Sequence, residues 1–455
     1  MAQSVNIREI VLSLLEETEK ENTPCQTAIH RALMKYQYLD KKDRSFISRV
    51  TRGTIEYQIY LDMVISQFSS VKLMKIKPVI RRILRMSAYQ ILKMDSVPSH
   101  AACNEAVKLA AKRGFRGLKG YVNGVLRSID RNRDAIRLPD ETAEPVKYLS
   151  AAYSMPEWIV SRWLEIYDFQ TVKGMLGASL SERPVTVRIN TQRISREDFY
   201  KRLEKEHGDV KVCKGNYTDF SAGLSGYDYL VGLSVFKEGL CYVQDESSML
   251  AGVLAGIKPG DKVIDVCAAP GGKSMNAALL GGIVDARDVS PAKLEKIREN
   301  LDRTEITGVT VSLADGTVFD VTSEQTADVV IADVPCSGLG IIGKKADIKY
   351  RIKAEDIEAL VALQRKILTN AWRYVRPGGT LIYSTCTVSR AENEAQVQWL
   401  KDNFLLETVD ISESLPENIS CETAKQGYIQ LLPGQCDCDG FFIAKLRRQG
   451  QNSEE

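Results

Sequence analysis

Two cysteines stand where a thiol is able to do chemistry. Cys336 lies in the segment Asp-Val-Pro-Cys-Ser (333–337) and Cys386 in Ser-Thr-Cys-Thr (384–387), and an apolar, β-branched run precedes each one. A buried cysteine usually packs as a small hydrophobe, and that interpretation holds for Cys103 and Cys241. Cys336 and Cys386 instead stand among turn-forming and polar residues at predicted strand ends. Because a thiolate is a strong nucleophile, these two positions indicate covalent catalysis.

A glycine turn precedes both thiols in the sequence. Residues 265–274 read DVCAAPGGKS, and the last three match the end of a phosphate-binding loop, G-x-x-x-x-G-K-[ST]. The first glycine of that motif would fall at position 267, where this chain has Cys267. The sequence therefore argues against a nucleotide-phosphate loop. Gly271 and Gly272 still allow a ligand to approach the backbone closely.

Aspartates follow several predicted strands. Asp265, Asp288, Asp315 and Asp333 each lie at or just after a short apolar run. Any one of them alone is typical of an ordinary turn or helix cap, and their joint placement is what indicates a site. Four carboxylates are poor neighbours for a pyrophosphate, so they favour an adenosine-bearing ligand without phosphates. Asp288 follows the glycine turn by about twenty residues, the spacing at which a carboxylate binds ribose hydroxyls.

A thiolate beside a sulfonium methyl donor indicates one reaction in particular. Carbon 5 of cytosine is a poor nucleophile until a thiolate adds to carbon 6, which makes carbon 5 enamine-like and able to attack a methyl group. The enzyme must then remove the carbon 5 proton and expel the sulfur. The two thiols therefore predict methylation of carbon 5 of cytosine.

The elements that position these residues have the rhythm of a doubly wound α/β fold. Short apolar runs alternate with amphipathic helices, and parallel strands of such a sheet bring their carboxyl ends to one edge, where ligands bind. The predicted strands are 262–268, 283–289, 309–314, 327–334 and 378–386. All the residues above therefore face one crevice.

The chain before this region divides in two. Apolar residues recur at helical spacing from Ile7 to about Asp130, and residues 131–145 are polar and contain proline, as a linker does. Residues 146–235 mix helical patterning with β-branched alternation. We expect an all-helical domain over 1–140, a small α+β connector over 146–235 and a Rossmann-like domain over 236–447.

Charge is distributed unevenly along the chain. Residues 1–140 contain 25 lysines and arginines against 14 acidic residues, whereas the whole chain has 61 against 59. Within 72–137 the count is 16 basic and 4 acidic residues. This density suits the phosphates of a nucleic acid; the alternative is a solvated helical face.

Cysteine and histidine usage bears on compartment and metals. The ten cysteines are scattered and only three histidines are present, which favours free thiols in a reducing compartment and no metal site. Cys436 and Cys438 are two residues apart, but no second pair or histidine lies near them in the sequence. The first twenty residues lack the apolar core of a signal peptide, and no run of eighteen apolar residues occurs. We expect a cytoplasmic protein that does not enter membranes.

Three motifs resemble those of a known family. The segments CAAPGGK (267–273), DVPCSG (333–338) and YSTCT (383–387) are similar to the cofactor motif and the two cysteine motifs of the S-adenosylmethionine-dependent RNA (cytosine-5)-methyltransferases. The resemblance implies that Cys386 is the nucleophile, that Cys336 assists product release, and that Asp333 also meets the cytosine edge. It implies a cofactor pocket formed by Cys267, Ala268, Ala269, Pro270, Gly271, Gly272, Lys273, Asp288, Asp315 and Asp333.

The resemblance extends over nearly the whole chain. Residues 187–191 and 236–250 are similar to segments of this family, and 104–129 resembles the NusB-type helical RNA-binding domain. Together they resemble the members that act as monomers on 16S ribosomal RNA. Two departures are Met155, where the family usually has histidine, and residues 343–350 (GKKADIKY), which lack the family's paired arginines and proline. The second departure bears on RNA contacts.

Two alternatives follow from the same residues. A NusB-like head is also typical of a noncatalytic RNA-binding or antitermination factor, but such a protein has no need of two thiols beside a cofactor loop. In DNA cytosine methyltransferases the thiol of the Pro-Cys motif attacks. The Thr-Cys motif and the basic head argue against that assignment.

Overall fold

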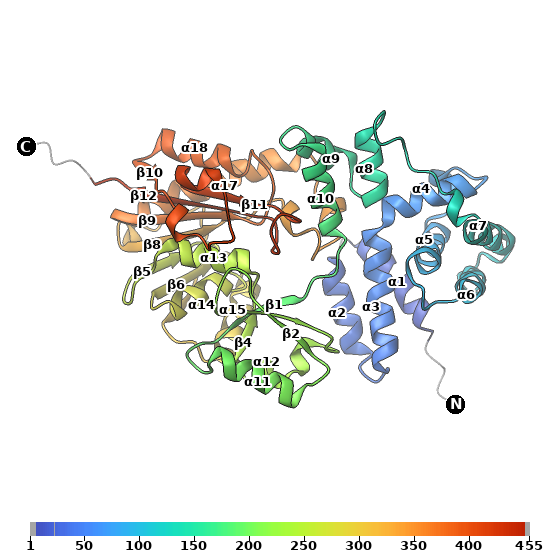
Figure 1. Cartoon of the computed structure of the whole chain (residues 1–455), viewed down its shortest axis with the longest axis horizontal. Helices are drawn as coiled ribbons and strands as arrows, with labels where there is room; N and C mark the ends of the chain where they lie inside the picture. Colours follow the sequence, from blue (N-terminus) through green and yellow to red (C-terminus); the bar gives the residue numbers. More distant parts are fainter. Residues whose placement is uncertain (1–5, 22, 451–455) are drawn as a thin grey trace, which may run out of the picture. The chain divides into compact units, whose positions relative to one another are not determined.

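The chain folds into two compact units. The structure, a computed structural model, describes residues 6–21 and 23–450 (Figure 1). The first unit comprises residues 1–180 with 342–352, and the second comprises 181–341 with 353–455. Among the described residues, the helices are all too short or too polar to cross a membrane.

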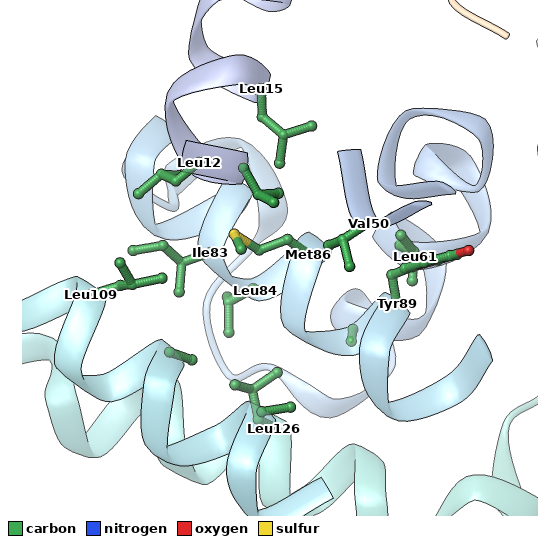
Figure 2. Close-up of a cluster of buried hydrophobic side chains, with 14 of the residues drawn as sticks. Leu12, Leu15, Val50, Leu61, Ile83, Leu84, Met86, Tyr89, Leu109 and Leu126 are labelled. Carbon is green, nitrogen blue, oxygen red and sulfur yellow. The ribbon is translucent and has the colours of Figure 1, made fainter. Parts of the chain in front are cut away.

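The first unit is helical. Its core forms where the apolar stripes of successive helices meet, and Leu12, Ile83, Leu84 and Leu126 are fully buried there (Figure 2). α5 begins with Pro78 at its first turn, where the missing N–H of proline costs nothing. The helices are α1 (Ile7–Lys20), α2 (Cys25–Lys35), α3 (Lys41–Glu56), α4 (Gln58–Phe68), α5 (Pro78–Lys93), α6 (Ser99–Lys112), α7 (Lys119–Arg131), α8 (Pro145–Tyr153), α9 (Glu157–Leu164) and α10 (Phe169–Ser179). The predicted all-helical N-terminal domain is confirmed.

Residues 342–352 belong to the helical unit although both flanking segments belong to the other unit. They include α16 (Ile348–Arg351). Asp347 accepts a hydrogen bond from the Cys25 amide at 3.1 Å, and Lys349 Nζ donates to the Glu56 carbonyl at 2.8 Å. Lys349 is 1% exposed, and burial lowers its pKa to about 7. This segment contains the residues that depart from the family pattern, and two of its charged residues, Asp347 and Lys349, are buried within the helical unit.

The second unit begins with a small antiparallel sheet of order β2-β3-β1-β4. Its core contains Val187, Phe199, Leu203 and Leu224, all of which are fully buried. The elements are β1 (Val185–Ile189), α11 (Arg196–Glu206), β2 (Lys211–Lys214), β3 (Ser221–Ser225), α12 (Ser234–Lys237) and β4 (Cys241–Val243). Strands β1, β2 and β3 fall within the predicted connector, whereas β4 lies beyond its predicted end, and α8–α10 of that segment group with the helical unit. The proposed three-part division is therefore still a prediction.

An eight-stranded sheet follows, with the order β10-β12-β9-β8-β5-β6-β7 and β11 paired to β12. Strands β9, β8, β5, β6 and β7 are parallel, and β12 runs antiparallel to β9. The strands are β5 (Lys262–Asp265), β6 (Ile283–Asp288), β7 (Val309–Leu313), β8 (Ala327–Asp333), β9 (Val375–Thr385), β10 (Leu406–Thr408), β11 (Tyr428–Leu431) and β12 (Phe441–Arg448). All five predicted strands are present, and the predicted Rossmann-like fold is confirmed.

Helices cover both faces of this sheet. Val263 and Ile382 pack on one face with residues of α13 and α14, while Ile264 and Leu381 pack on the other with residues of α17. The helices are α13 (Glu246–Ala255), α14 (Gly272–Leu279), α15 (Pro291–Thr304), α17 (Asp356–Tyr374) and α18 (Glu394–Asn403). The strand order reverses between β5 and β8. Strands β6 and β7 lie on one side of β5, whereas β8 and β9, which follow them in the chain, lie on the other side. Ligands of doubly wound folds bind at such a switch point.

Candidate active site

The two predicted catalytic thiols are in contact. Cys336 follows β8 and Cys386 follows β9, and these neighbouring parallel strands end in register, with Asp333 opposite Ser384. Cys336 Sγ and Cys386 Sγ are 3.4 Å apart, and both residues are half-buried. The rule that parallel strands bring their carboxyl ends together therefore predicted this pair correctly.

The surroundings of Cys336 disfavour the loss of its proton. The hydrogen bond to Cys386 raises the pKa of Cys336 well above its usual range, and burial and the nearby Glu392 and Asp333 carboxylates raise it further. Cys336 therefore keeps its proton and has an S–H that it is able to donate to the neighbouring sulfur.

Asp333 is held from two sides at the end of β8. Its Oδ2 accepts from Lys273 Nζ at 2.7 Å, and its Oδ1 accepts from Ser384 Oγ at 3.0 Å. The Lys273 ammonium also lies 4.9 Å from the centre of the Phe441 ring. A charge-assisted hydrogen bond of this kind fixes the carboxylate more firmly than a neutral one. Asp333 thus joins the glycine turn to the strand that carries Cys386.

The glycine turn runs from the end of β5 into α14. Gly271 has φ +99°, a conformation that favours glycine, and a Cβ added there would lie 3.0 Å from the Ile297 side chain. The Ala268 amide donates to the Arg287 carbonyl at 2.8 Å, which ties the turn to β6. Burial raises the pKa of the Cys267 thiol, so that this thiol stays protonated. The residues of the turn are Cys267, Ala268, Ala269, Pro270, Gly271, Gly272 and Lys273.

The two further predicted cofactor carboxylates have different surroundings. Asp288 is 5% exposed, and its Oδ1 accepts from the Ser290 amide at 3.1 Å and lies 3.6 Å from Lys293 Nζ. Asp315 is exposed and its Oδ1 accepts from the amide and the hydroxyl of Thr317, which lower its pKa. Asp315 therefore also serves as an ordinary turn aspartate. Asp315, Arg287 and Tyr374 are among the residues that line a hollow of about 330 Å³, and Asp288 is not.

Unpaired buried oxygens beside the turn fit a polar ligand. Asp265 Oδ1 and Gln244 Oε1 are buried without a hydrogen-bond partner among the described residues. Asp265 Oδ2 accepts from Ser274 Oγ at 2.7 Å, and burial raises the pKa of this carboxyl to about 7. The Gln244 side chain lies 3.6 Å from the Cβ position of Gly272. Buried polar atoms without partners are rare in native proteins, so the surroundings of the turn suit a ligand with hydrogen-bonding groups.

No metal cluster occurs in the part of the chain that the structure describes. Groups of three or more histidine, cysteine or carboxylate side chains placed to hold an ion are absent from residues 6–21 and 23–450. Cys436 and Cys438 lie in the connection between β11 and β12 as free thiols.

The basic segment of the helical unit, residues 72–137, includes two contrasting groups of cations. Arg82 and Arg85 are buried and pair with Glu19 and Asp62, so these cations stabilise the fold. Within the described residues, eight further cations are exposed and have no carboxylate in ion-pair range. They are Lys72, Lys75, Lys77, Arg116, Lys119, Arg127, Arg131 and Arg137. The exposed group carries the positive charge that a phosphate backbone is able to meet.

The chain is similar to known proteins over nearly its whole length. The 16S rRNA methyltransferase RsmB/F model matches residues 253–447, the NusB family model matches 5–131, and a ferredoxin-like domain of RsmF/B-like methyltransferases matches 155–217. The probable ribosomal RNA small subunit methyltransferase B of Bacillus subtilis is 32% identical over 98% of this chain and 100% of its own length. The corresponding Synechocystis protein is 30% identical over 98% of this chain and 100% of its own length. The solved structure of PH0851 is 25% identical, with a TM-score of 0.80 over 98% of this chain and 99% of its own.

The fold and its site define a Rossmann-like methyltransferase with a NusB-type helical domain. The chain belongs to the 16S rRNA methyltransferase RsmB/F family. The resemblance found in the sequence is thereby confirmed, together with the methyl donor, S-adenosylmethionine. Membership of this family argues against the noncatalytic alternative.

Sequence reasoning missed the residues that surround the thiols. Ser337 and Thr387, each directly after a thiol, were quoted within motifs but given no role, and Glu392 and Asn393 were not singled out. All four are buried polar residues. The available signal was the polar composition of a segment that closely follows Cys386, but such a segment reads equally well as a surface loop.

Proposed function

We propose that this chain methylates carbon 5 of a cytosine in 16S ribosomal RNA through a covalent intermediate on Cys386. The observation that carries the proposal is the thiol pair, 3.4 Å apart, at the switch-point edge of the sheet. The relatives named for methylation of small-subunit ribosomal RNA support the substrate class. Covalent attack on carbon 6 explains why two thiols stand at a methyltransferase site.

Cys386 begins the reaction. Its thiolate forms the S–C6 bond, and the electron pair of the C5–C6 double bond moves to carbon 5. When bound, S-adenosylmethionine would supply the methyl group that carbon 5 takes, with its S–CH3 bond broken and a neutral thioether left. Asp333, held by Lys273 and Ser384, presents a fixed carboxylate to the amino edge of the base.

Cys336 acts at the end of the reaction. The carbon 5 proton leaves to solvent, the S–C6 bond breaks, and the C5–C6 double bond re-forms. The departing sulfur of Cys386 then carries the negative charge. Because Cys336 keeps its proton, its S–H donates to this sulfur and stabilises the leaving thiolate. Without that donor, the sulfur remains bonded to the base for longer.

The remaining predicted residues hold the methyl donor. Asp288 accepts hydrogen bonds from the ribose hydroxyls, and the turn residues 267–273 border the rest of the molecule together with Asp315. The unpaired oxygens of Asp265 and Gln244 accept further hydrogen bonds there. These side chains orient the donor toward the thiol pair and hold its shape before the base arrives.

The helical unit contributes RNA affinity. Its exposed cations, among them Lys119 and Arg127, meet backbone phosphates, a contribution that falls as salt rises. We propose that the chain works as a monomer in the cytoplasm, with residues 1–140, 146–235 and 236–447 as RNA-binding, connector and catalytic domains.

Denaturing gels with each thiol variant test the proposed function. Cys386→Ala is expected to abolish methyl transfer and to form no RNA adduct, because the ring is never activated. Cys336→Ala is expected to methylate and to accumulate RNA-linked protein, because release is slow. Cys421→Ala, which removes another half-buried thiol of the same unit, is the matched control and is expected to behave as the wild type.

The opposite gel result would reverse the roles of the two thiols. An adduct with Cys386→Ala and none with Cys336→Ala would place the attacking thiol in the Pro-Cys motif, as in DNA cytosine methyltransferases. Bisulfite sequencing of the RNA product checks separately that the modified position is carbon 5 of cytosine.

A further inference from the structure

The residues that follow the two thiols hydrogen-bond to each other. Ser337 Oγ and Thr387 Oγ1 are 2.6 Å apart, and the Leu339 amide donates to Thr387 Oγ1 at 3.3 Å. Ser337 is 4% exposed and Thr387 is 0% exposed. The loop that carries Cys336 is thus joined directly to the strand end that carries Cys386.

Glu392 binds the Cys336 side of this junction. It is fully buried; its Oε1 accepts from the Ser337 amide at 2.8 Å, and its Oε2 accepts from Ser337 Oγ at 2.6 Å. Gln364 Nε2 donates to the same Oε1 at 3.2 Å. One carboxylate therefore holds both the backbone and the side chain of the residue next to Cys336.

Asn393, the next residue in the chain, binds the Cys386 side. Its Oδ1 accepts from Thr385 Oγ1 at 2.6 Å, and its Nδ2 donates to the Thr387 carbonyl at 3.1 Å. Nδ2 also donates to Gln430 Oε1 at 2.7 Å. Two of the residues that Asn393 contacts, Thr385 and Thr387, are thus the immediate neighbours of Cys386 in the chain.

We propose that Glu392 and Asn393 are positioning residues that set the separation of the two thiols. Together with Ser337 and Thr387 they form what we call the thiol brace. Glu392 binds the residue next to Cys336, and Asn393 binds the residues next to Cys386. Because Glu392 and Asn393 are consecutive, the backbone that joins them fixes the loop of Cys336 relative to the strand end of Cys386. The proposal deepens the proposed function, on which its catalytic consequences rest.

The cost of such a network favours this role over simple packing. A buried carboxylate loses its hydration, and an apolar residue of similar volume at such a site is often no less stable. The hydrogen bonds to Glu392 offset this cost only when all of them are formed, so the network imposes one geometry. Displacing a reacting group by about 1 Å costs about a hundredfold in rate, which is reason enough to keep the thiols fixed.

The two halves of the brace predict opposite defects. Glu392→Ala releases the loop of Cys336. This variant is therefore expected to methylate RNA and to accumulate the RNA adduct, as is expected of Cys336→Ala. Asn393→Ala releases the strand end of Cys386, so methyl transfer is expected to fall by about a hundredfold with little adduct. A purely structural role would lower both activities in parallel.

The contact between the thiols is measurable without RNA or cofactor. Diamide removes two electrons and two protons from a thiol pair, forming one disulfide and becoming the hydrazine. Mass spectrometry of digested full-length protein reports the rate at which the Cys336–Cys386 disulfide forms. Because the rate depends on how often the sulfurs meet, we expect it to fall at least about fivefold in Glu392→Ala and Asn393→Ala.

Glu246→Ala is the matched control. Glu246 is another buried glutamate of the same unit that accepts from backbone amides, those of Tyr217 and Thr218, and from a serine hydroxyl, that of Ser221. Its loss removes the same kind of contacts away from the thiols, and the disulfide rate is expected to stay within twofold of wild type. Thr387→Val keeps the side-chain shape and removes one hydroxyl of the brace, so it serves where an alanine variant does not fold; we expect a smaller slowing, of about twofold to threefold.

Equal disulfide rates in the wild type, Thr387→Val and the folded alanine variants would overturn the brace. Slowed disulfide formation in the brace variants, with a wild-type enzyme that forms no RNA adduct, would support the brace and overturn the covalent mechanism. Slowed formation together with opposite adduct patterns in Glu392→Ala and Asn393→Ala supports both.

Discussion

The core of the helical unit and the edge of the sheet at which the parallel strands end are formed by different kinds of buried residues. Leu84 and its neighbours in the helical core are apolar side chains that touch one another (Figure 2). At the sheet edge, Asp265, Glu392 and Asn393 are equally buried but polar, and all of their side-chain oxygens and nitrogens except Asp265 Oδ1 are hydrogen-bonded. The apolar core gains free energy from area removed from water, whatever the detail of its packing. The polar edge gains little net stability and holds chosen atoms in place.

The difference teaches where each region is sensitive. A change in the helical core should alter the free energy of unfolding and leave ligand affinity alone. A change at the sheet edge should alter ligand affinity and leave the free energy of unfolding alone, or should alter how that free energy depends on pH. The following predictions are ordered from the largest expected effect to the smallest.

Leu84→Ala tests the helical side of the comparison. Leu84 is fully buried in α5, so truncation leaves a cavity, and we expect the helical unit to lose about 2–5 kcal/mol of unfolding free energy. Urea unfolding followed by circular dichroism measures the loss. Calorimetry of S-adenosylmethionine binding to the folded variant should give wild-type affinity; a tenfold loss would show that the two regions are coupled.

Asp265→Asn tests how the sheet edge responds to pH. Burial raises the pKa of Asp265 to about 7, so between its unfolded value and about pH 7 the folded chain binds a proton that the unfolded chain has lost. The unfolding free energy of the wild type therefore falls as pH rises from about 4 to about 7, by an amount on the order of 2–3 kcal/mol. Asparagine keeps an acceptor for Ser274 and does not titrate.

The measurement is urea unfolding of both proteins at several pH values across that range. The difference in unfolding free energy between Asp265→Asn and wild type should increase with pH and become constant above about pH 8. A difference that stays constant from pH 4 to pH 8 would show that Asp265 titrates alike in both states.

Asp288→Ala tests the ligand-binding role of the edge. Loss of charge-assisted hydrogen bonds to the ribose should weaken S-adenosylmethionine binding by about 1–3 kcal/mol. Asp328→Ala is the control, because Asp328 lies near the start of β8 and accepts from the amide of Lys262, the first residue of β5, whereas Asp288 is the last residue of β6. Calorimetry that gives the same affinity for Asp288→Ala and wild type would remove Asp288 from the site.

Neutralising exposed cations should have the smallest effect per residue. Arg116→Gln, Lys119→Gln and Arg127→Gln should each reduce the slope of log affinity for RNA against log salt by about 1. Lys108→Gln removes a cation that already pairs with Glu105 at 2.7 Å, so it should change the slope less. Truncating residues 1–140 is a poorer test, because it would leave the buried Lys349 without the Glu56 carbonyl. Equal slopes for all four variants would argue that the helical unit presents only a solvated face.

Local pattern was enough to predict much of this molecule. Helical spacing predicted the first helices, and β-branched runs predicted the five parallel strands, because both signals come from neighbours in the sequence. The contact between Cys336 and Cys386 followed from a general property of parallel sheets, without any measured distance. The turn at 267–273 was identified from its glycines and its motif.

Long-range contacts were beyond the reach of such patterns. The apolar run of β12 does not reveal that it lies antiparallel beside β9. Glu392 and Asn393 carry no motif of their own, and their importance depends on loops from two other parts of the sheet. The departure of residues 343–350 from the family pattern was connected with RNA contacts alone, and nothing in their sequence indicates that Lys349 is buried and donates to the Glu56 carbonyl of α3.

The placement of residues 342–352 has a consequence for the order in which the molecule is made. Lys349 and its acceptor on Glu56 are 293 positions apart in the chain, and Asp347 and the Cys25 amide are 322 apart. A nascent chain that has emerged only as far as residue 340 has all the helices α1–α10 but lacks both of these contacts. The first unit to be synthesised is therefore not the first to be finished: its last segment arrives only after β8 and Cys336 have been made.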